Sequence, residues 1–266
     1  MTASAILLEL SGGVATLTFN RPGELNTLSP QLRTAFIEAV AQLETLDDLR
    51  CLVIRGAGPA FMAGGDIKGY YKRLDGDRSK LRDDLRHRIG AMNSAIVSLR
   101  NLPIPVVASV HGAVAGAGLS LMMACDLVIA ADETVFTLAY SRIGVSPDCS
   151  GSFFLPRILG LRKAMEIALL GDRFDAATAH DLGLVNWVVP TAQLAGETDK
   201  LAIRLAASPT RALATTKALL NQSFDTALEA QLGAEAIGFG DCVMSDDFAE
   251  GVRAFVEKRK PIFSGS

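Results

Sequence analysis

The stretch His111-Gly-Ala-Val-Ala-Gly-Ala-Gly-Leu-Ser120 decides how this chain is organised. It follows the strand-like apolar run 106–110, and its small residues allow a tight turn and close approach of a ligand to the main chain. The turn opens directly into a helical segment, so its first main-chain N–H groups are unpaired and carry partial positive charge. Such donors stabilise a carbonyl oxygen that gains negative charge during a reaction. The stretch therefore predicts a strand–turn–helix unit with an anion-stabilising turn.

The segments on either side of this unit alternate between strand and helix patterns. Strands are expected at 5–10, 14–19, 51–54, 126–131 and 185–189, in addition to 106–110. Helices are expected from Ser29-Pro30 onward and at 79–99, 116–125, 162–170, 176–182, 193–207, 209–221, 226–238 and 246–258. This order predicts an α/β core with parallel strands in residues 1–200 and a C-terminal helical region in residues 201–266.

Composition narrows the class of protein. The 266 residues are 49% hydrophobic and 21% charged, which is typical of a globular protein with a large core. The net charge of -3 argues against nucleic acid as a partner. No apolar run is long enough to span a membrane, and no basic segment precedes the apolar residues near Met1, so we expect neither a membrane partner nor a signal peptide. Four dispersed cysteines and three dispersed histidines favour a cytoplasmic protein with reduced thiols and no metal site.

A second glycine-rich loop, Phe61-Met-Ala-Gly-Gly-Asp-Ile-Lys68, also follows a strand-like run. If the two loops meet, the N–H groups of Gly65 and Ala117 can both point at one oxygen. Taken singly, each loop is explained equally well by ordinary turn and packing glycines. Neither loop contains a GxGxxG or GKS/GKT nucleotide-binding pattern.

Motifs along nearly the whole chain resemble the crotonase superfamily, that is, the enoyl-CoA hydratase/isomerase family. They are Asn20-Arg21-Pro22, Leu25-Asn26, Phe61–Lys68, His111–Gly118, Cys125-Asp126, Leu159-Gly160 with Ala164, Gly183-Leu-Val185, Glu250–Phe255 and Glu257–Pro261. The resemblance implies a spiral of ββα units followed by a helical C-terminal region. It also implies an acyl-CoA thioester as substrate, with coenzyme A as part of that substrate and no separate cofactor, and assembly as a homotrimer or hexamer.

The resemblance also implies the roles of particular positions. The N–H groups of Gly65 and Ala117 would polarise the thioester carbonyl and stabilise an enolate. The positions where the family holds coenzyme A are Leu25, Ala63, Asp66, Ile67 and Lys68. His111 and Asp126 are expected to be structural, the first packing the turn and the second capping or forming an ion pair.

Two positions depart from the hydratase pattern. Ser120 and Tyr140 stand where typical hydratases carry the glutamates that position water and transfer a proton. Their hydroxyls ordinarily have pKa values far above neutral, so hydration is disfavoured. Tyr140 is expected either to donate a hydrogen bond to the substrate or to line its pocket.

Asp148 is the remaining acid. It aligns with an aspartate used by some isomerases and dehalogenases of the family, and the run Phe153-Phe-Leu-Pro-Arg157 resembles the branch that contains isomerases of phenylacetate degradation. One carboxylate suffices to move a proton between two carbons. Local sequence alone also allows a helix N-cap at Asp148. The preferred interpretation is an acyl-CoA isomerase; a hydratase-like or dehalogenase-like enzyme, or a non-catalytic relative that binds acyl-CoA or RNA, remains as an alternative.

Overall fold

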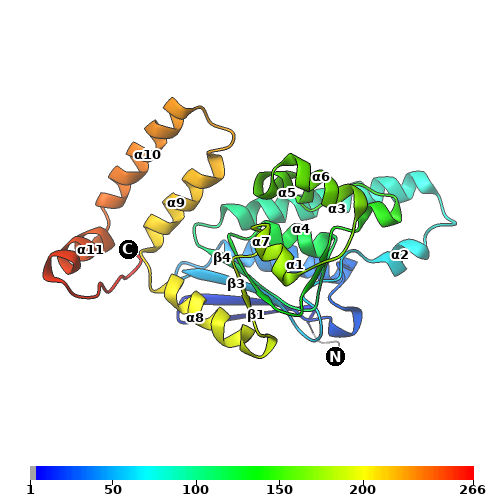
Figure 1. Ribbon diagram of the computed structural model, residues 1–266, viewed down its shortest axis with the longest axis horizontal. Helices are drawn as coiled ribbons and strands as arrows, with labels where there is room; N and C mark the ends of the chain where they lie inside the picture. The colour runs from blue at the N-terminus through cyan, green and yellow to red at the C-terminus, as the bar shows by residue number, and fades with distance from the viewer. Residues whose placement is uncertain (1–3) are drawn as a thin grey trace.

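The computed structural model describes residues 4–266, which fold as two sheets flanked by helices (Figure 1). The larger sheet has the strand order β1-β2-β3-β4-β6-β9. Its strands are β1 Ile6–Ser11, β2 Val14–Phe19, β3 Cys51–Gly56, β4 Val106–Val110, β6 Leu127–Ala131 and β9 Trp187–Val189. β1 and β2 form an antiparallel hairpin, and every later neighbour pairs in parallel. The predicted α/β core with parallel strands is confirmed.

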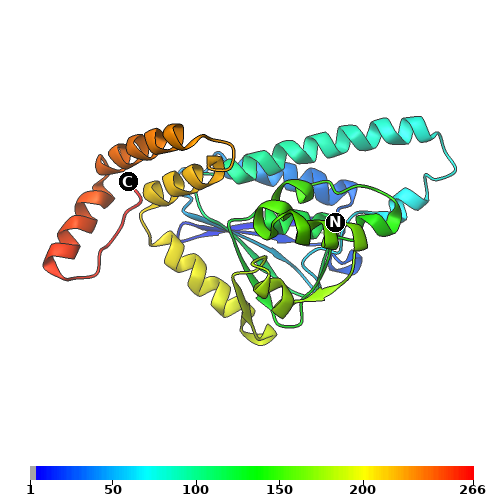
Figure 2. The ribbon, with the colours of Figure 1, turned by 45° about the horizontal axis from the view of Figure 1, so that its top comes forward.

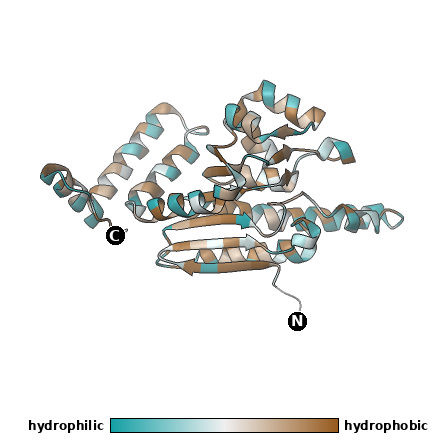
Figure 3. Cartoon of the chain, turned by 60° about the horizontal axis from the view of Figure 1, so that its bottom comes forward, coloured by the Kyte–Doolittle hydropathy of each residue, from teal (hydrophilic) through white to brown (hydrophobic). Residues whose placement is uncertain are grey.

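The large sheet is covered on both faces, which explains why its central strands are continuous apolar runs. In β3, Leu52 and Ile54 face the main core, while Cys51 and Val53 belong to a second buried cluster. Figure 3 shows the strands largely in the brown of hydrophobic residues. The helices α1 Pro30–Leu43 and α3 Arg78–Asn101 lie together on the main-core side. On the opposite face, α8 Leu194–Ala206 contributes apolar residues to the second cluster.

A smaller sheet positions the glycine-rich turn. It has the order β5-β7-β8, with bounds β5 Ala113–Ala115, β7 Val135–Thr137 and β8 Phe174–Asp175. β5 leads directly into α4 Ala117–Met123, all of whose residues are buried. The chain then continues through β6 and β7 to a short 3-10 helix, η2 Tyr140–Ile143, and to α5 Gly151–Leu159. The strand–turn–helix unit predicted around residues 111–120 is present.

The remaining helices follow the two sheets. These are α2 Ile67–Tyr71, α6 Leu161–Leu170, α7 Ala176–Asp181, α9 Thr210–Gln222, α10 Leu228–Val243 and α11 Asp246–Glu257, with short 3-10 turns at Pro22–Glu24 and Thr191–Gln193. Figures 1 and 2 show α9, α10 and α11 extending away from the sheets, on the side opposite to α2. We call residues 209–266 the C-terminal arm. Among the helices of residues 4–266, none has the length and apolarity needed to cross a bilayer.

The sequence expectations differ from the observed elements in several places. The helices α2 and α5 are not among the predicted helices. Three short strands, β5, β7 and β8, were not anticipated, because two or three residues are too few to display alternation. The predicted helix 226–238 extends to Val243. Gly238 is not a stop signal there, because it is buried where α10 packs on α9 and a Cβ would contact Thr215.

Candidate active site

Main-chain contacts hold the two glycine-rich loops together. The N–H of Ala115 donates to the carbonyl of Met62 at 3.0 Å, and the N–H of Met62 donates to the carbonyl of Ala113 at 3.2 Å. Further along, a Cβ built on Gly64 would lie 3.3 Å from the carbonyl oxygen of Ala115. The expected meeting of the two loops therefore occurs, and it brings Gly65 beside the start of α4.

The two N–H groups singled out from the sequence are available for a ligand. Within residues 4–266, neither Gly65 nor Ala117 donates its N–H to a main-chain or side-chain acceptor. Ala117 is the first residue of α4, and Gly116 before it provides no side-chain cap. Unpaired donors near a buried turn are what an oxyanion hole requires.

Gly118 explains how α4 approaches the other loop so closely. A Cβ at this position would overlap the carbonyl oxygen of Met62 and lie 2.8 Å from the Met62 Cβ. A side chain here would push the start of α4 away from the loop that carries Gly65. Gly118 is therefore required where the glycine-rich loops 61–68 and 111–120 meet. We call this meeting point the loop junction.

Asp148 joins a hydrogen-bonded group with the two positions that depart from the hydratase pattern. The Tyr140 hydroxyl donates to Asp148 Oδ1 at 2.6 Å, and Ser120 Oγ lies 3.2 Å from the same hydroxyl. Ser120 is 0% exposed and Tyr140 is 9% exposed. Burial, followed by the charge of Asp148, raises the pKa of Tyr140 well above its ordinary value. Tyr140 therefore remains a hydrogen-bond donor.

The alternative of Asp148 as a helix cap is wrong. The N-cap of α5 is Ser150, and no side chain caps the helix. Asp148 contributes only its main-chain carbonyl, which accepts from the N–H of Gly151 at 3.0 Å. Its carboxylate is directed to Tyr140 instead.

Another aromatic hydroxyl, which the sequence did not single out, lies beside Gly65 and within the electrostatic influence of Asp148. A Cβ built on Gly65 would lie 3.4 Å from the Tyr70 hydroxyl oxygen. Burial raises the pKa of Tyr70, and the charge of Asp148 adds to this effect. Arg33 from α1 acts on Tyr70 in the opposite direction, and burial lowers its own pKa. Tyr70 could not have been identified from sequence, because α2 is too short to show a periodic pattern.

The positions expected to hold coenzyme A form an accessible rim beside Gly65. Ile67 is 48% exposed, Leu25 is 43% exposed, and Lys68 is also exposed. The N–H of Ala63 donates to the carbonyl of Leu25 at 3.0 Å, which fixes these two loops side by side. Asp66 caps α2 by accepting the N–H of Gly69 at 2.8 Å. The structure thus gathers these residues on one surface.

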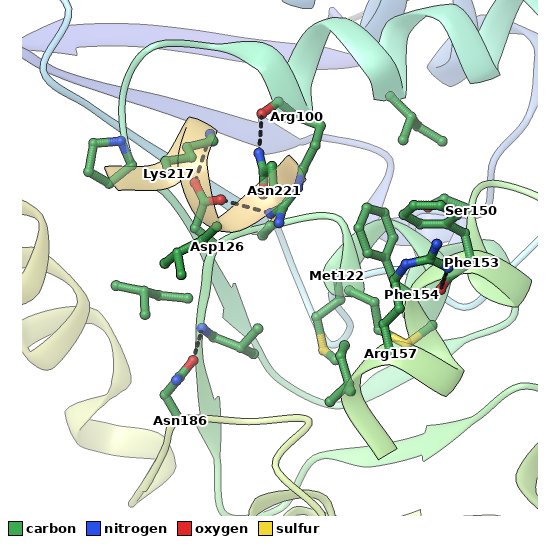
Figure 4. Close-up of a pocket in the computed structure, with 18 of the residues that line it drawn as sticks. Arg100, Met122, Asp126, Ser150, Phe153, Phe154, Arg157, Asn186, Lys217 and Asn221 are labelled. Atoms are coloured by element: carbon green, nitrogen blue, oxygen red, sulfur yellow. Dashed lines mark hydrogen bonds and ion pairs between the residues drawn. The ribbon is translucent and has the colours of Figure 1, made fainter. Parts of the chain in front are cut away.

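A cavity of about 790 Å³ lies elsewhere, between the core and α9 (Figure 4). Its lining includes Phe153 and Phe154 of α5 but none of Gly65, Ala117, Tyr140 or Asp148. Asp126 lies in its wall, paired with Arg100 at 2.8 Å and with Lys217 at 2.8 Å. The expected structural role of Asp126 is therefore confirmed, because it ties α3 and α9 to the start of β6.

His111 packs the glycine-rich turn, as the sequence suggested. Its Nε2 lies 2.8 Å from the carbonyl oxygen of Gly58. The contact joins the β4 turn to the loop that follows β3. His111 therefore stabilises the same loop junction that carries the two unpaired N–H groups.

Comparisons with known proteins agree with this arrangement of loops and sheets. The enoyl-CoA hydratase/isomerase family profile matches residues 9–266. The chain is 37% identical to a 1,2-epoxyphenylacetyl-CoA isomerase of Escherichia coli, over 98% of each protein. It is 32% identical to a trans-2-decenoyl-acyl-carrier-protein isomerase of Streptococcus mutans, over the full length of both. The crystal structure of an enoyl-CoA hydratase from Polaromonas superposes with a TM-score of 0.90 at 36% identity, over 97% of this chain and 99% of the other.

The fold and the paired loops define a crotonase-type α/β protein. The chain belongs to the enoyl-CoA hydratase/isomerase family. The relatives carry both isomerase and hydratase names, so the family membership alone leaves the reaction open.

Proposed function

We propose that this protein is an acyl-CoA isomerase that shifts a double bond, or carries out a related enolate rearrangement, in an enoyl-CoA-type thioester. One observation carries the proposal: the two positions where hydratases have glutamates hold Ser120 and Tyr140, and both belong to the hydrogen-bonded group around the single carboxylate of Asp148. A hydratase needs carboxylates to orient water, whereas an isomerase needs one group that takes and returns a proton. The similarity to the E. coli isomerase supports this reading.

In the proposed reaction, Asp148 removes a proton from the α-carbon of a 3-enoyl thioester. The electron pair of the C–H bond moves toward the carbonyl, and the N–H groups of Gly65 and Ala117 stabilise the oxygen of the dienolate. Asp148 then returns the proton to the γ-carbon, which yields the conjugated 2-enoyl thioester. The 3-enoyl and 2-enoyl thioesters have the same atoms and the same oxidation level, so the reaction needs no added reagent.

The rim residues support a coenzyme A thioester as the substrate. Leu25, Ala63 and Ile67 offer apolar and main-chain contacts next to Gly65, and Lys68 adds a positive charge. Coenzyme A would enter as part of the substrate, and the proposed reaction needs no further cofactor.

We further propose that the protein assembles as a homotrimer or hexamer. The C-terminal arm supports this, because it leaves large apolar side chains uncovered in a single chain, including Phe239 at 72% and Phe255 at 86% exposure. Light scattering after gel filtration tests the mass, which for a trimer is three times that of the 28.1 kDa chain.

The activity test follows conjugation of 3-enoyl-CoA esters by absorbance. Asp148→Asn should lower kcat by about 10²- to 10⁴-fold, while Asp83→Asn, at an exposed carboxylate on α3, should leave it unchanged. Full activity in Asp148→Asn would contradict the role of Asp148. A 3-hydroxyacyl product would instead favour hydration, and binding of coenzyme A esters without any turnover would favour the non-catalytic alternative.

A further inference from the structure

We propose that Tyr140 is a positioning residue for Asp148 and that Ser120 holds Tyr140 in place. The two positions that hold catalytic glutamates in hydratases would thus serve here to orient one carboxylate. This inference rests on the proposed function, because it assigns roles around the proton-transferring group.

The directions of the hydrogen bonds follow from the number of protons. A phenol has one proton, and the 2.6 Å separation between the Tyr140 hydroxyl and Asp148 Oδ1 is typical of an O–H donating to a carboxylate. The Tyr140 oxygen is then left to accept. Ser120, with its Oγ 3.2 Å away, donates to that oxygen. Ser120 thus donates a hydrogen bond to Tyr140, and Tyr140 donates one to Asp148.

Three different elements position the side chains of this hydrogen-bonded group. Ser120 lies on α4, Tyr140 begins η2, and Asp148 precedes α5. The start of α5 passes so close to Ser120 that a Cβ on Gly151 would lie 2.5 Å from the Ser120 Oγ. The absence of a side chain at Gly151 therefore leaves the room that the Ser120 hydroxyl occupies beside Tyr140.

Anchoring one carboxylate oxygen leaves the other for chemistry. With Oδ1 held by Tyr140, the proton taken from the substrate goes to Oδ2. Besides burial, the charge of Asp148 also raises the pKa of Tyr70 on α2 and of the Cys149 thiol, while the charge of Arg33 on α1 acts on both in the opposite direction. Burial raises the pKa of the Cys149 thiol, with Asp148 adding to the effect, so this thiol stays neutral. Tyr140 is the group that supplies a short hydrogen bond.

The function of this bond is to keep Oδ2 pointed at the substrate through both proton transfers. Without it the protonated carboxyl can rotate and exchange its proton with water before returning it. A displacement of the reacting group by about 1 Å is enough to lower a rate by about 10²-fold.

The test compares Tyr140→Phe with the matched variant Tyr71→Phe, whose parent side chain is 75% exposed on α2. Tyr140→Phe should lower kcat by about 10- to 100-fold with KM nearly unchanged, and Tyr71→Phe should change neither. In D₂O the Tyr140→Phe product should contain more solvent deuterium at the γ-carbon than the wild-type product. A merely structural role for Tyr140 would not alter this partition.

Ser120→Ala gives an independent readout, even if Tyr140→Phe does not fold. It should lower kcat by a smaller factor of about 2 to 10, because one neutral hydrogen bond is lost. In the Tyr140→Phe background, Ser120→Ala should have no further effect, since both act through one contact. Unchanged kcat in Tyr140→Phe or in Ser120→Ala, or fully additive losses, would overturn the proposal.

The outcomes separate this inference from the proposed function. Active wild type, inactive Asp148→Asn and fully active Tyr140→Phe would remove the positioning role alone. A wild-type protein that converts no 3-enoyl-CoA ester would remove the proposed function itself.

Discussion

The core around the loop junction and the C-terminal arm differ in the exposure of their large apolar side chains. In the core, Phe19, Phe36 and Phe61 are 0% exposed and pack against one another, with 5.5 Å between the ring centroids of Phe19 and Phe61. In the arm, Phe224 and Phe255 are 68% and 86% exposed. One chain therefore covers its own core but leaves the apolar side chains of the arm uncovered.

This difference separates two kinds of stability. The core is stabilised by burial within a single chain, whereas the arm is tied to it by a few polar contacts. Lys217 reaches the carboxylate of Asp126 and the carbonyl of Ile104, and Arg50 reaches Thr210 at 3.0 Å. Variants in the two regions should therefore have different readouts.

The largest effect is expected from Phe36→Ala. Removing a fully buried ring should cost about 3–5 kcal/mol in the free energy of unfolding. Phe255→Ala should change that free energy of the single chain by less than about 0.5 kcal/mol, but should weaken association of the chains. Urea unfolding and light scattering measure the two quantities. Equal destabilisation by both variants would contradict the contrast between core and arm.

Gly118→Ala should affect activity next most strongly. The added methyl group meets the carbonyl of Met62, displaces the start of α4, and removes the Ala117 N–H from the oxyanion site. We expect kcat to fall by about 10²- to 10³-fold, as for loss of one oxyanion donor. Gly90→Ala on α3 is the control, because nothing lies within 4 Å of its Cβ position. Near-normal activity of Gly118→Ala would contradict the expectation that the start of α4 must lie close to the loop that carries Gly65.

An intermediate effect is expected from Lys217→Met, which loosens the arm. Asp126 retains Arg100 and the N–H of Val106, so the loss should be about 1.5–3 kcal/mol, the range for a hydrogen bond to a charged group. Hydrogen exchange should become faster in α9 first. Lys200→Met provides the comparison, because its exposed pair with Glu197 should contribute less than about 1 kcal/mol. Unchanged exchange in α9 would argue that Lys217 does not anchor the arm.

The smallest effect is expected when acid protonates Glu250, which holds the C-terminal end of the arm. The guanidinium of Arg259 and the N–H of Ile262 lower the pKa of Glu250 from 4.5 to about 2. A depressed carboxyl pKa contributes stability fully above pH 4.5, and this contribution is lost as the pH falls toward 2. The protection factor of the Ile262 amide, which corrects for the intrinsic pH dependence of exchange, should fall over this range in the wild type. In Glu250→Ala, which removes the acceptor of the Ile262 N–H, this protection should already be low at neutral pH, and a protected amide there would contradict the contact.

The β4–turn–α4 unit was predictable because its apolar run and small residues act locally. The contact between Tyr140 and Asp148 could not be predicted from the sequence. It depends on η2, which begins after Ala139 at φ 44° and ends at Gly144 at φ 71°, two left-handed residues that reverse the chain. The family resemblance singled out both residues but placed Tyr140 against the substrate. That contact remains a prediction, while the structure places the Tyr140 hydroxyl on Asp148.

Tyr70 and the exposure of the arm show the same limit of sequence reasoning. Tyr70 meets Gly65 only because the short α2 folds back over the loop. The sequence predicted the helices α9–α11, but it could not indicate whether their apolar side chains are covered by the same chain.

The main-chain hydrogen bonds between the two glycine-rich loops also bear on how this scaffold changes its chemistry. In the proposed reaction, the groups that activate the carbonyl are main-chain N–H groups, whereas the groups that act on the proton are the side chains of residues 120, 140 and 148. Activation and reaction type are therefore separable properties. If the proposed roles hold, substitutions at those three positions should change the reaction while carbonyl activation is retained, which makes the site a starting point for redesign.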